Sequence, residues 1–242
     1  MRIAVLSDVH ANLAALEAVL DAVEQEQVDE LWSLGDVVGY GPQPSACLAL
    51  IGSRCSLCLA GNHDLVVAGV IDLDVFAHDA GTAARWTAEV LTDEERQTLA
   101  SGSPAGERDG VEVYHGSIRD PIWEYVLDDR TASVCLDLQR HSVALIGHSH
   151  LPVVFGYDGD QFYSGMAPAD SLLELSGGRA LLNPGSVGQP RDGDPRAAFM
   201  LLDTDAATAV WRRVDYDIRR TQAEIREAGL PARLGARLAE GR

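Results

Sequence analysis

The chain has 242 residues, 46% hydrophobic and 23% charged, so it is long enough to bury a sizeable core without disulfide staples. Its 37 acidic residues outnumber its 19 basic residues, all of them arginine, and the formal net charge is -18. A surface this acidic disfavours binding to extended nucleic acid along a basic face, so an anionic substrate would need a local positive centre.

The amino-terminal apolar stretch is about five residues long, too short for a signal peptide. No later stretch approaches the roughly 18 apolar residues that a membrane-spanning helix needs. We therefore expect a cytoplasmic protein with no membrane partner. Four cysteines do not indicate a disulfide framework, and we interpret the isolated pair Cys55 and Cys58 as thiols in and beside a buried strand.

The first 60 residues alternate short apolar strands with helical stretches. Strands are predicted at 2–7, 30–34 and 55–60, and helices at about 12–25 and 45–52. This alternation predicts βαβ units and a parallel sheet. Residues from about 65 to 101 are predicted to be mostly helical, with Thr92 and Glu95 at the spacing of a capping box.

From about residue 111 onward, short strands follow one another closely and few helices intervene. They are predicted at 111–115, 143–147, 152–157, 160–164, 171–175, 179–183, 197–203 and 208–216. This density favours antiparallel sheet. A last helix is predicted at about 217–228. We expect an α/β fold in which two sheets pack together within one domain, residues 1–242; two separate domains are the alternative.

Metal-competent side chains follow five of these strands. They are Asp8 and His10, Asp36, Asn62 with His63 and Asp64, His115, and His148 with His150. Ligands of α/β sheets bind at this carboxyl edge. Gly35, Gly61 and Gly147 each precede a candidate ligand, where the absence of Cβ permits close approach to an ion. Singly, each residue has an ordinary interpretation as a helix cap or loop residue, but their joint occurrence favours one shared centre.

The order of these blocks resembles a known family. DVH at 8–10, GDVV at 35–38, GNHD at 61–64, the separate His115 and GHSH at 147–150 match the pattern of the calcineurin-like metallophosphoesterase superfamily. The stretches SDVHANLAALEAVL and NPGSVGQPR further resemble its small prokaryotic phosphodiesterase-like branch. The resemblance implies a two-sheet β-sandwich flanked by helices, in agreement with the strand pattern.

The resemblance also implies a role for each block. Seven ligands are too many for one tetrahedral ion, and they suit two ions that share a carboxylate. One ion would be held by Asp8, His10, Asp36 and His150, and the other by Asp36, Asn62, His115 and His148. His63 would face the substrate, and Asp64 would orient its ring. GDVV lacks the arginine that follows this block in the family's phosphoprotein phosphatases, which argues against that activity.

Two divalent ions would create the local positive centre that an anionic substrate needs. Mixed Asp, Asn and His ligands favour Mn, Fe, Zn, Co or Ni over Mg, and the sequence does not choose among them. A hydroxide bridging the ions would attack phosphorus in line, and His63 would donate a proton to the leaving oxygen or stabilise the charge that develops there.

Substrate selection would come from the rim of this centre. Tyr40, Arg119 and Arg191 are the candidates, because arginine clamps phosphate and aromatic rings stack on bases. We interpret Trp123 as a packing residue. The sequence thus predicts a dinuclear metal phosphoesterase for a small phosphodiester or nucleotide. The alternatives are a dinucleoside polyphosphate hydrolase, a phosphomonoesterase, and a non-catalytic scaffold that binds partner proteins. No particular oligomer is predicted.

Overall fold

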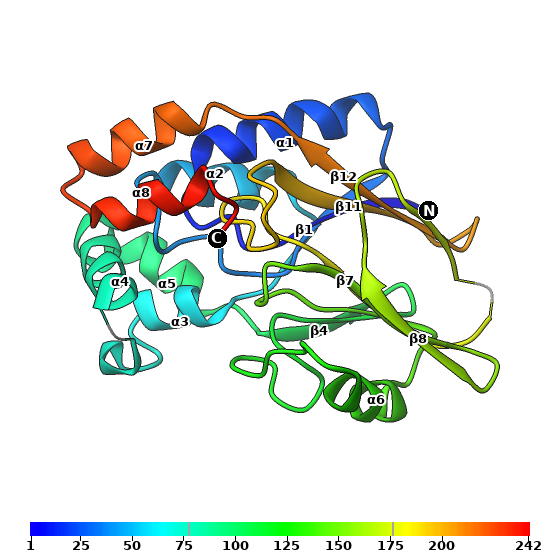
Figure 1. Ribbon diagram of the computed structural model, residues 1–242. Helices are drawn as coiled ribbons and strands as arrows, with labels where there is room; N and C mark the ends of the chain where they lie inside the picture. Colours follow the sequence, from blue (N-terminus) through cyan, green and yellow to red (C-terminus); the bar gives the residue numbers. More distant parts are fainter. Residues whose placement is uncertain (77, 176) are drawn as a thin grey trace.

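The computed structural model describes residues 1–76, 78–175 and 177–242, and it contains two sheets packed face to face with helices outside them (Figure 1). Helices α1, α2 and α7 lie over one sheet, and α6 lies beneath the other. Helices α3, α4, α5 and α8 gather at one end of the sandwich. These layers confirm the predicted fold class.

The first sheet combines strands from the two ends of the chain. The strand order is β3-β2-β1-β11-β12-β9; β1, β2 and β3 are parallel, and the other pairings are antiparallel. Its strands are β1 (Arg2–Leu6), β2 (Glu30–Ser33), β3 (Leu57–Cys58), β9 (Leu172–Glu174), β11 (Ala197–Asp203) and β12 (Thr208–Val214).

The second sheet has the strand order β4-β5-β6-β10-β7-β8. Its centre, β5, β6 and β10, is parallel, so the antiparallel sheet expected after residue 111 is only part of the arrangement. Its strands are β4 (Ala105–Arg108), β5 (Val111–Tyr114), β6 (Val143–Leu145), β7 (Pro152–Asp158), β8 (Gln161–Met166) and β10 (Ala180–Pro184).

The alternation of side chains along β1 explains how the layers are held together. Ile3 and Val5 belong to the core between the two sheets, whereas Ala4 and Leu6 belong to the core beneath α1 and α2. Successive side chains of a strand point to opposite faces, so a wholly apolar strand is buried on both sides. A third core lies between α6 and the second sheet.

Eight α-helices and one short 3-10 helix complete the described part of the chain. They are α1 (Leu13–Gln25), α2 (Pro44–Arg54), α3 (Asn62–Val67), the 3-10 helix (Leu73–Val75), α4 (His78–Val90), α5 (Asp93–Ala100), α6 (Asp129–Leu138), α7 (Ile218–Glu227) and α8 (Ala232–Leu238). Asn12 caps α1 by accepting a hydrogen bond from the Ala15 amide. The capping box of Thr92 and Glu95 is confirmed at the start of α5.

Several elements differ from the sequence-based expectation. The strand predicted at 55–60 is only Leu57–Cys58, and α6, α8 and β4 were not predicted. Cys58 is exposed, so the interpretation of the pair as buried thiols was wrong for this residue; all four cysteines are free. The mostly helical segment 65–101 contains residue 77, which lies outside the described residues. No helix in the described ranges is long and apolar enough to cross a bilayer.

Candidate metal centre

The structure brings the predicted ligands together at one edge of the sandwich. Parallel strands β1, β2 and β3 of the first sheet end beside β5 and β6 of the second, and each is followed by candidate ligands. All seven predicted ligands are buried: Asp8, His10, Asp36, Asn62, His115, His148 and His150. Buried ionisable and imidazole groups in such number need polar or ionic partners.

The backbone at five of these ligands is left-handed. The φ angles are 55° at Asp8, 49° at His10, 53° at Asp36, 63° at His148 and 61° at His150. This region is rare for residues with a Cβ and costs roughly 1 kcal/mol or more at each position. Strain concentrated at these positions indicates that the side chains are held there for a function.

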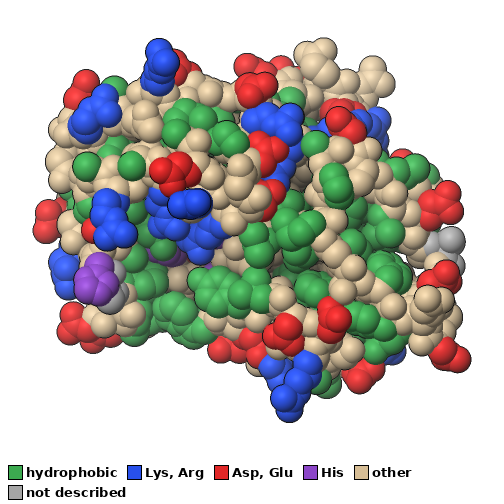
Figure 2. Space-filling model, in the orientation of Figure 1, with side chains coloured by type: hydrophobic (Ala, Val, Ile, Leu, Met, Phe, Trp, Pro, Cys, Tyr) green, Lys and Arg blue, Asp and Glu red, His purple; other side chains and the backbone are tan. Residues whose placement is uncertain are grey.

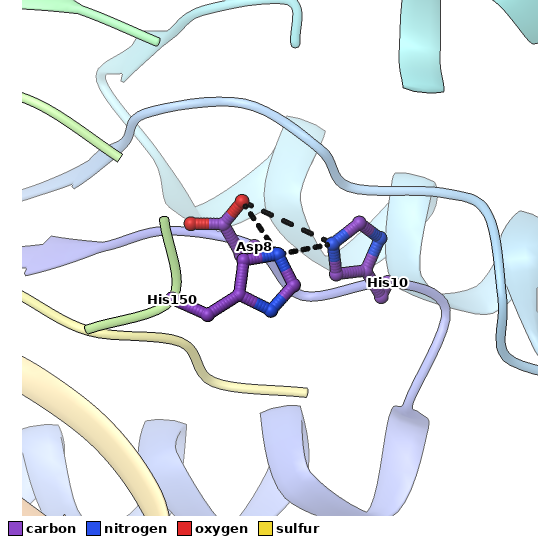
Figure 3. A group of neighbouring side chains, drawn as sticks. All are labelled: Asp8, His10 and His150. Carbon is purple, nitrogen blue, oxygen red and sulfur yellow. Dashed lines mark hydrogen bonds and ion pairs between the residues drawn. The ribbon is translucent and has the colours of Figure 1, made fainter. Parts of the chain in front are cut away.

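The first cluster consists of Asp8, His10 and His150 (Figure 3). The Nε2 atoms of His10 and His150 lie 3.0 Å apart. Oδ1 of Asp8 lies 3.4 Å from Nε2 of His150 and 3.9 Å from Nε2 of His10. Within the described residues, this buried oxygen has no hydrogen-bond partner. The three side chains thus direct the atoms that could ligate a metal toward one small region.

The second cluster consists of Asp36, His115 and His148, with Asn62 beside it. Nε2 of His115 lies 3.1 Å from Oδ1 of Asn62 and 3.5 Å from Oδ2 of Asp36. The same Oδ2 atom lies 3.7 Å from Nε2 of His10 in the first cluster. The amide of His63 donates to the other Asp36 oxygen at 2.8 Å, so Oδ2 is the atom that faces both clusters.

Backbone carbonyls orient all four histidines of the two clusters. Nδ1 of His10 faces the Val38 oxygen at 3.2 Å, that of His115 the Leu34 oxygen at 2.9 Å, and that of His150 the Gln189 oxygen at 2.6 Å. His148 is turned the other way, with Nε2 facing the Trp123 oxygen at 3.2 Å. A carbonyl fixes the proton on the ring nitrogen that it contacts, which leaves the opposite nitrogen with a lone pair for a metal.

The loop that contains NPGSVGQPR supports the first cluster from behind, a role that the sequence did not reveal. Ser186 Oγ donates to the Asp8 carbonyl at 2.8 Å, and the Gly188 amide donates to it at 3.0 Å. The Asn183 side-chain amide donates to the Gly147 carbonyl at 2.7 Å. The resemblance of this stretch to its family branch was the only available signal.

Burial dominates the ionisation of the centre. Loss of solvation raises the pKa of the Asp8 carboxyl to about 7, and it raises that of Asp36 well above its ordinary value. The same loss of solvation lowers the ring pKa of His10 and His150 well below the ordinary value and lowers that of His148 to about 3. The rings are therefore neutral, as metal ligands must be. A bound cation would stabilise the charged carboxylates.

His63 occupies a different environment from the four carbonyl-bound histidines. Its ring lies between Tyr40 and Phe76, with centroid distances of 4.4 Å to each. Its buried Nδ1 has no hydrogen-bond partner among the described residues. A Cβ built on Gly39, where φ is +88°, would lie 2.5 Å from that nitrogen, so the ring depends on a glycine there. His63 also lies within ligand reach of His10 and Asp36.

Asp64 does not orient the His63 ring, which corrects the expectation for that residue. Its Oδ1 accepts from the Val38 amide at 3.0 Å, and its Oδ2 accepts from the amides of Gly61 at 2.9 Å and Val37 at 3.3 Å. Three amides of two loops occupy the carboxylate. Asp64 therefore joins the loop after β2, which contains Asp36, to the start of α3.

A cavity of about 300 Å³ opens onto both clusters. Predicted substrate residues Tyr40 and Arg191 line it, together with His63, His148 and His150. Figure 2 shows Arg side chains gathered beneath the C-terminal helices, above a hollow bordered by hydrophobic side chains. Arg191 forms a hydrogen bond to the Gln189 side chain at 3.1 Å, and no carboxylate of the described ranges pairs with it.

Arg119 lies elsewhere, contrary to the expectation that it binds substrate. Its guanidinium forms an ion pair with Glu124, with Nε donating to a carboxylate oxygen at 3.0 Å, and it does not line the cavity. Glu124 follows Trp123 in the same loop, so the charge of Arg119 is neutralised locally. Its part in the structure is to brace this loop.

Three aromatic residues line the cavity without having been assigned to the site. Tyr125 stacks on His148, with a centroid distance of 4.0 Å and an interplanar angle of 11°. Phe76 packs on His63 with its ring tilted by 30°, and Trp123 meets Phe76 edge to face at 6.1 Å. Trp123 therefore packs against Phe76, as its interpretation as a packing residue expects, and it also lines the cavity with 37% of its surface exposed.

Comparisons with known proteins agree with this geometry. The model of the calcineurin-like phosphoesterase superfamily domain matches residues 1–207. An uncharacterized protein of Methanocaldococcus jannaschii is 36% identical over 99% of this chain and 98% of its own length. Phosphodiesterase YfcE of Escherichia coli is 26% identical over 87% of this chain and 91% of its own length. A solved structure is also similar, the crystal structure of a metallophosphoesterase from Sphaerobacter thermophilus. Its sequence is 40% identical, the match covers 100% of this protein and 99% of the Sphaerobacter chain, and the TM-score is 0.91.

Proposed function

The chain belongs to the calcineurin-like phosphoesterase superfamily and is a metal-dependent phosphoric ester hydrolase, and from this premise we propose that it uses two divalent ions to hydrolyse a small phosphodiester or nucleotide. The proposal is supported by the clustered ligands, by the cavity above them and by the acidic surface, which disfavours a nucleic-acid chain as substrate.

The observation that carries the proposal is the contact between His10 and His150. Both rings place Nδ1 against a carbonyl oxygen, so both Nε2 atoms bear lone pairs, and these face each other at 3.0 Å. Two lone pairs repel at this distance. With the partnerless oxygen of Asp8 alongside, they form a set of three acceptors that fits a cation.

We assign the ligands of the two ions according to the two clusters. Asp8, His10, Asp36 and His150 would hold one ion; Asp36, Asn62, His115 and His148 would hold the other. Asp36 would serve both through Oδ2, which faces His10 and His115. The mixture of imidazole nitrogens with carboxylate and amide oxygens favours Mn, Fe, Zn, Co or Ni.

When bound, the two ions would supply Lewis-acid polarisation of the phosphate and would lower the pKa of the attacking water. The chain's own residues position the substrate. Arg191, which has no acidic partner among the described residues, would bind a non-bridging phosphate oxygen, and Tyr40 would restrict the position of the ester beside it.

The reaction breaks one P–O ester bond and forms one P–O bond to the oxygen of water, and the departing alkoxide gains a proton. His63 is the residue placed to assist departure, because it lines the cavity and is not oriented by a carbonyl as the four ligand histidines are. Burial lowers the ring pKa of His63 well below its ordinary value, so the neutral ring would donate a hydrogen bond to the departing oxygen and stabilise its charge, while the proton that this oxygen gains comes from water.

Hydrolysis of bis(p-nitrophenyl) phosphate tests this function. The metal-free protein should be inactive, addition of Mn or another transition ion should restore p-nitrophenolate release, and Asp36→Asn should nearly abolish it. Asp74→Asn is the matched control, because that side chain is 88% exposed. Full activity of Asp36→Asn would exclude the proposed centre. Two bound ions without hydrolysis of any phosphoester would favour the scaffold alternative.

A further inference from the structure

The aromatic residues at the mouth of the cavity form a surface that the proposed hydrolysis does not explain. We propose that Trp123 and Tyr125 form a stacking platform for a planar base, so that the preferred substrate is a nucleotide ester rather than a simple alkyl phosphodiester. This inference rests on the proposed function of the same site. The platform would identify the group attached to the phosphate as a nucleoside.

The orientation of Tyr125 is the first step. One face of its ring covers His148 at 4.0 Å in a nearly parallel stack, yet the side chain remains 44% exposed. The covered face is fixed by His148, so the exposed surface of the ring is held in a defined position rather than free to turn. A fixed, exposed aromatic face beside a polar centre suits a planar ligand.

Trp123 extends the same wall toward His63. Its ring contacts Phe76 edge to face, and Phe76 in turn lies on His63. The backbone oxygen of Trp123 contacts His148, so the aromatic loop is tied to a candidate ligand. The ion pair of Arg119 with Glu124 braces the loop next to Trp123. These contacts fix the loop that bears the two exposed rings against the candidate ligand His148.

Other residues of the cavity lining have a different chemistry. Arg191 lines the cavity together with Trp123 and Tyr125, and Tyr40, also in the lining, lies 6.0 Å from the guanidinium of Arg237 on α8. A phosphate in this cavity would have both a cation and exposed aromatic rings within reach. The cavity of about 300 Å³ is of the size that a mononucleotide fills.

The charge of the protein limits the substrate to a small nucleotide. At a net charge of -18, the protein as a whole would repel a longer polyanion that extends beyond the cavity. Exposed aromatic rings recognise every base through its flat face, so the platform predicts a preference for bases in general and not for one of them. A mononucleotide ester or dinucleotide satisfies both conditions.

The test compares two ligands that differ only in the base. Thymidine 5′-monophosphate and 2-deoxyribose 5-phosphate are used as competitive inhibitors of methyl p-nitrophenyl phosphate hydrolysis at constant free metal. The wild-type protein should bind the nucleotide about tenfold more tightly than the sugar phosphate. Trp123→Ala and Tyr125→Leu should each reduce this ratio toward one, and Trp123→Phe should retain most of it.

Tyr163→Leu is the matched control, because Tyr163 is a half-buried aromatic residue on β8, at the other end of the sandwich. It should leave the ratio unchanged. Equal inhibition by the two ligands in the wild-type protein would overturn the platform, as would a ratio that survives in both Trp123→Ala and Tyr125→Leu. If the metal-loaded protein hydrolyses no phosphoester, the proposed function fails instead, and nucleotide binding is then followed by quenching of tryptophan fluorescence, which Trp123→Phe should abolish.

Discussion

The carboxylate of Asp64 accepts a hydrogen bond from the Val38 amide at 3.0 Å and so holds the loop that contains Asp36, the candidate ligand proposed to be shared by two ions. Replacing Asp64 with Asn removes the charge and one of the acceptors that serve three amides. We expect Asp64→Asn to weaken metal binding by about 10- to 100-fold, the usual effect of losing a residue that orients ligands. Calorimetric titration with Mn measures it. An unchanged affinity, matching that of the exposed control Asp74→Asn, would show that the loop needs no such support.

The two histidines of GHSH should act on different ions, because His148 lies in the second cluster and His150 in the first. Each of His148→Ala and His150→Ala is expected to retain about one ion per chain where the wild-type protein holds about two. Elemental analysis of the dialysed proteins provides the count. The assignment fails if both variants lose the same ion, as shown by identical metal content after loading with two different metals.

Removal of the metal should reveal how much the burial of the charged Asp8 carboxylate lowers the free energy of unfolding. In the metal-free folded state its pKa is raised to about 7, whereas in the unfolded chain it is near 4, so the folded form binds the proton more tightly. The stabilising contribution of the protonated carboxyl is therefore lost as the pH rises from about 4 to about 7.

A chelator should accordingly lower the melting temperature at neutral pH. The free energy of unfolding should fall by about 2.7 kcal/mol for each site, if the free metal concentration before chelation was a hundred times the dissociation constant of that site. The variant Asp8→Asn should melt no lower than wild type once both are metal-free, because the amide has no charge to bury. Thermal melts with and without chelator decide this; a chelator-independent melting temperature would contradict it.

Metal affinity should increase with pH up to about 7, because an ion binds the deprotonated carboxylate and must displace the proton of Asp8 below that pH. His10 and His150 contribute little to this effect, since burial already keeps their rings neutral. Calorimetry at about pH 6 in two buffers with different ionisation enthalpies should reveal proton release on binding. Binding enthalpies that do not depend on the buffer would rule out this linkage.

Arg191 and Arg119 form a natural pair for comparison, because both were predicted to bind substrate and only Arg191 lines the cavity. Arg191→Gln should lower kcat/KM by about 10- to 100-fold, the value of a charge-assisted hydrogen bond to phosphate, while the metal content stays the same. Arg119→Gln breaks an ion pair with Glu124 and should have a much smaller effect. Equal losses in the two variants would mean that Arg191 does not contact the phosphate.

The sequence was sufficient to predict the layers and the clustering of ligands, because both follow from local patterns. A strand such as 2–7 can be recognised by its continuous apolar residues. Because neighbouring parallel strands end at the same edge of the sheet, the residues that follow them lie close together there. The helix Asp129–Leu138 was missed because its buried face consists of only three residues, Ala132, Cys135 and Leu136, among closely spaced strands.

The cavity wall was less predictable, because its members come together only in the tertiary structure. Phe76 and Trp123 are far apart in the chain, and neither belongs to a motif. The role of Asp64 could not be read from GNHD either, since the sequence does not show whether its carboxylate faces a ring or the backbone amides of a neighbouring loop. Pairings of this kind depend on loop geometry.

The left-handed backbone at five candidate ligands limits how far the thermal stability of this protein can be raised by substitution. These ligands are Asp8, His10, Asp36, His148 and His150. Glycine is the residue that relieves such a conformation, but at each of these positions it would remove a candidate ligand. Screens that select only for heat resistance should therefore tend to remove the proposed metal centre, and a thermostable variant that keeps this centre must gain its added stability elsewhere in the sandwich.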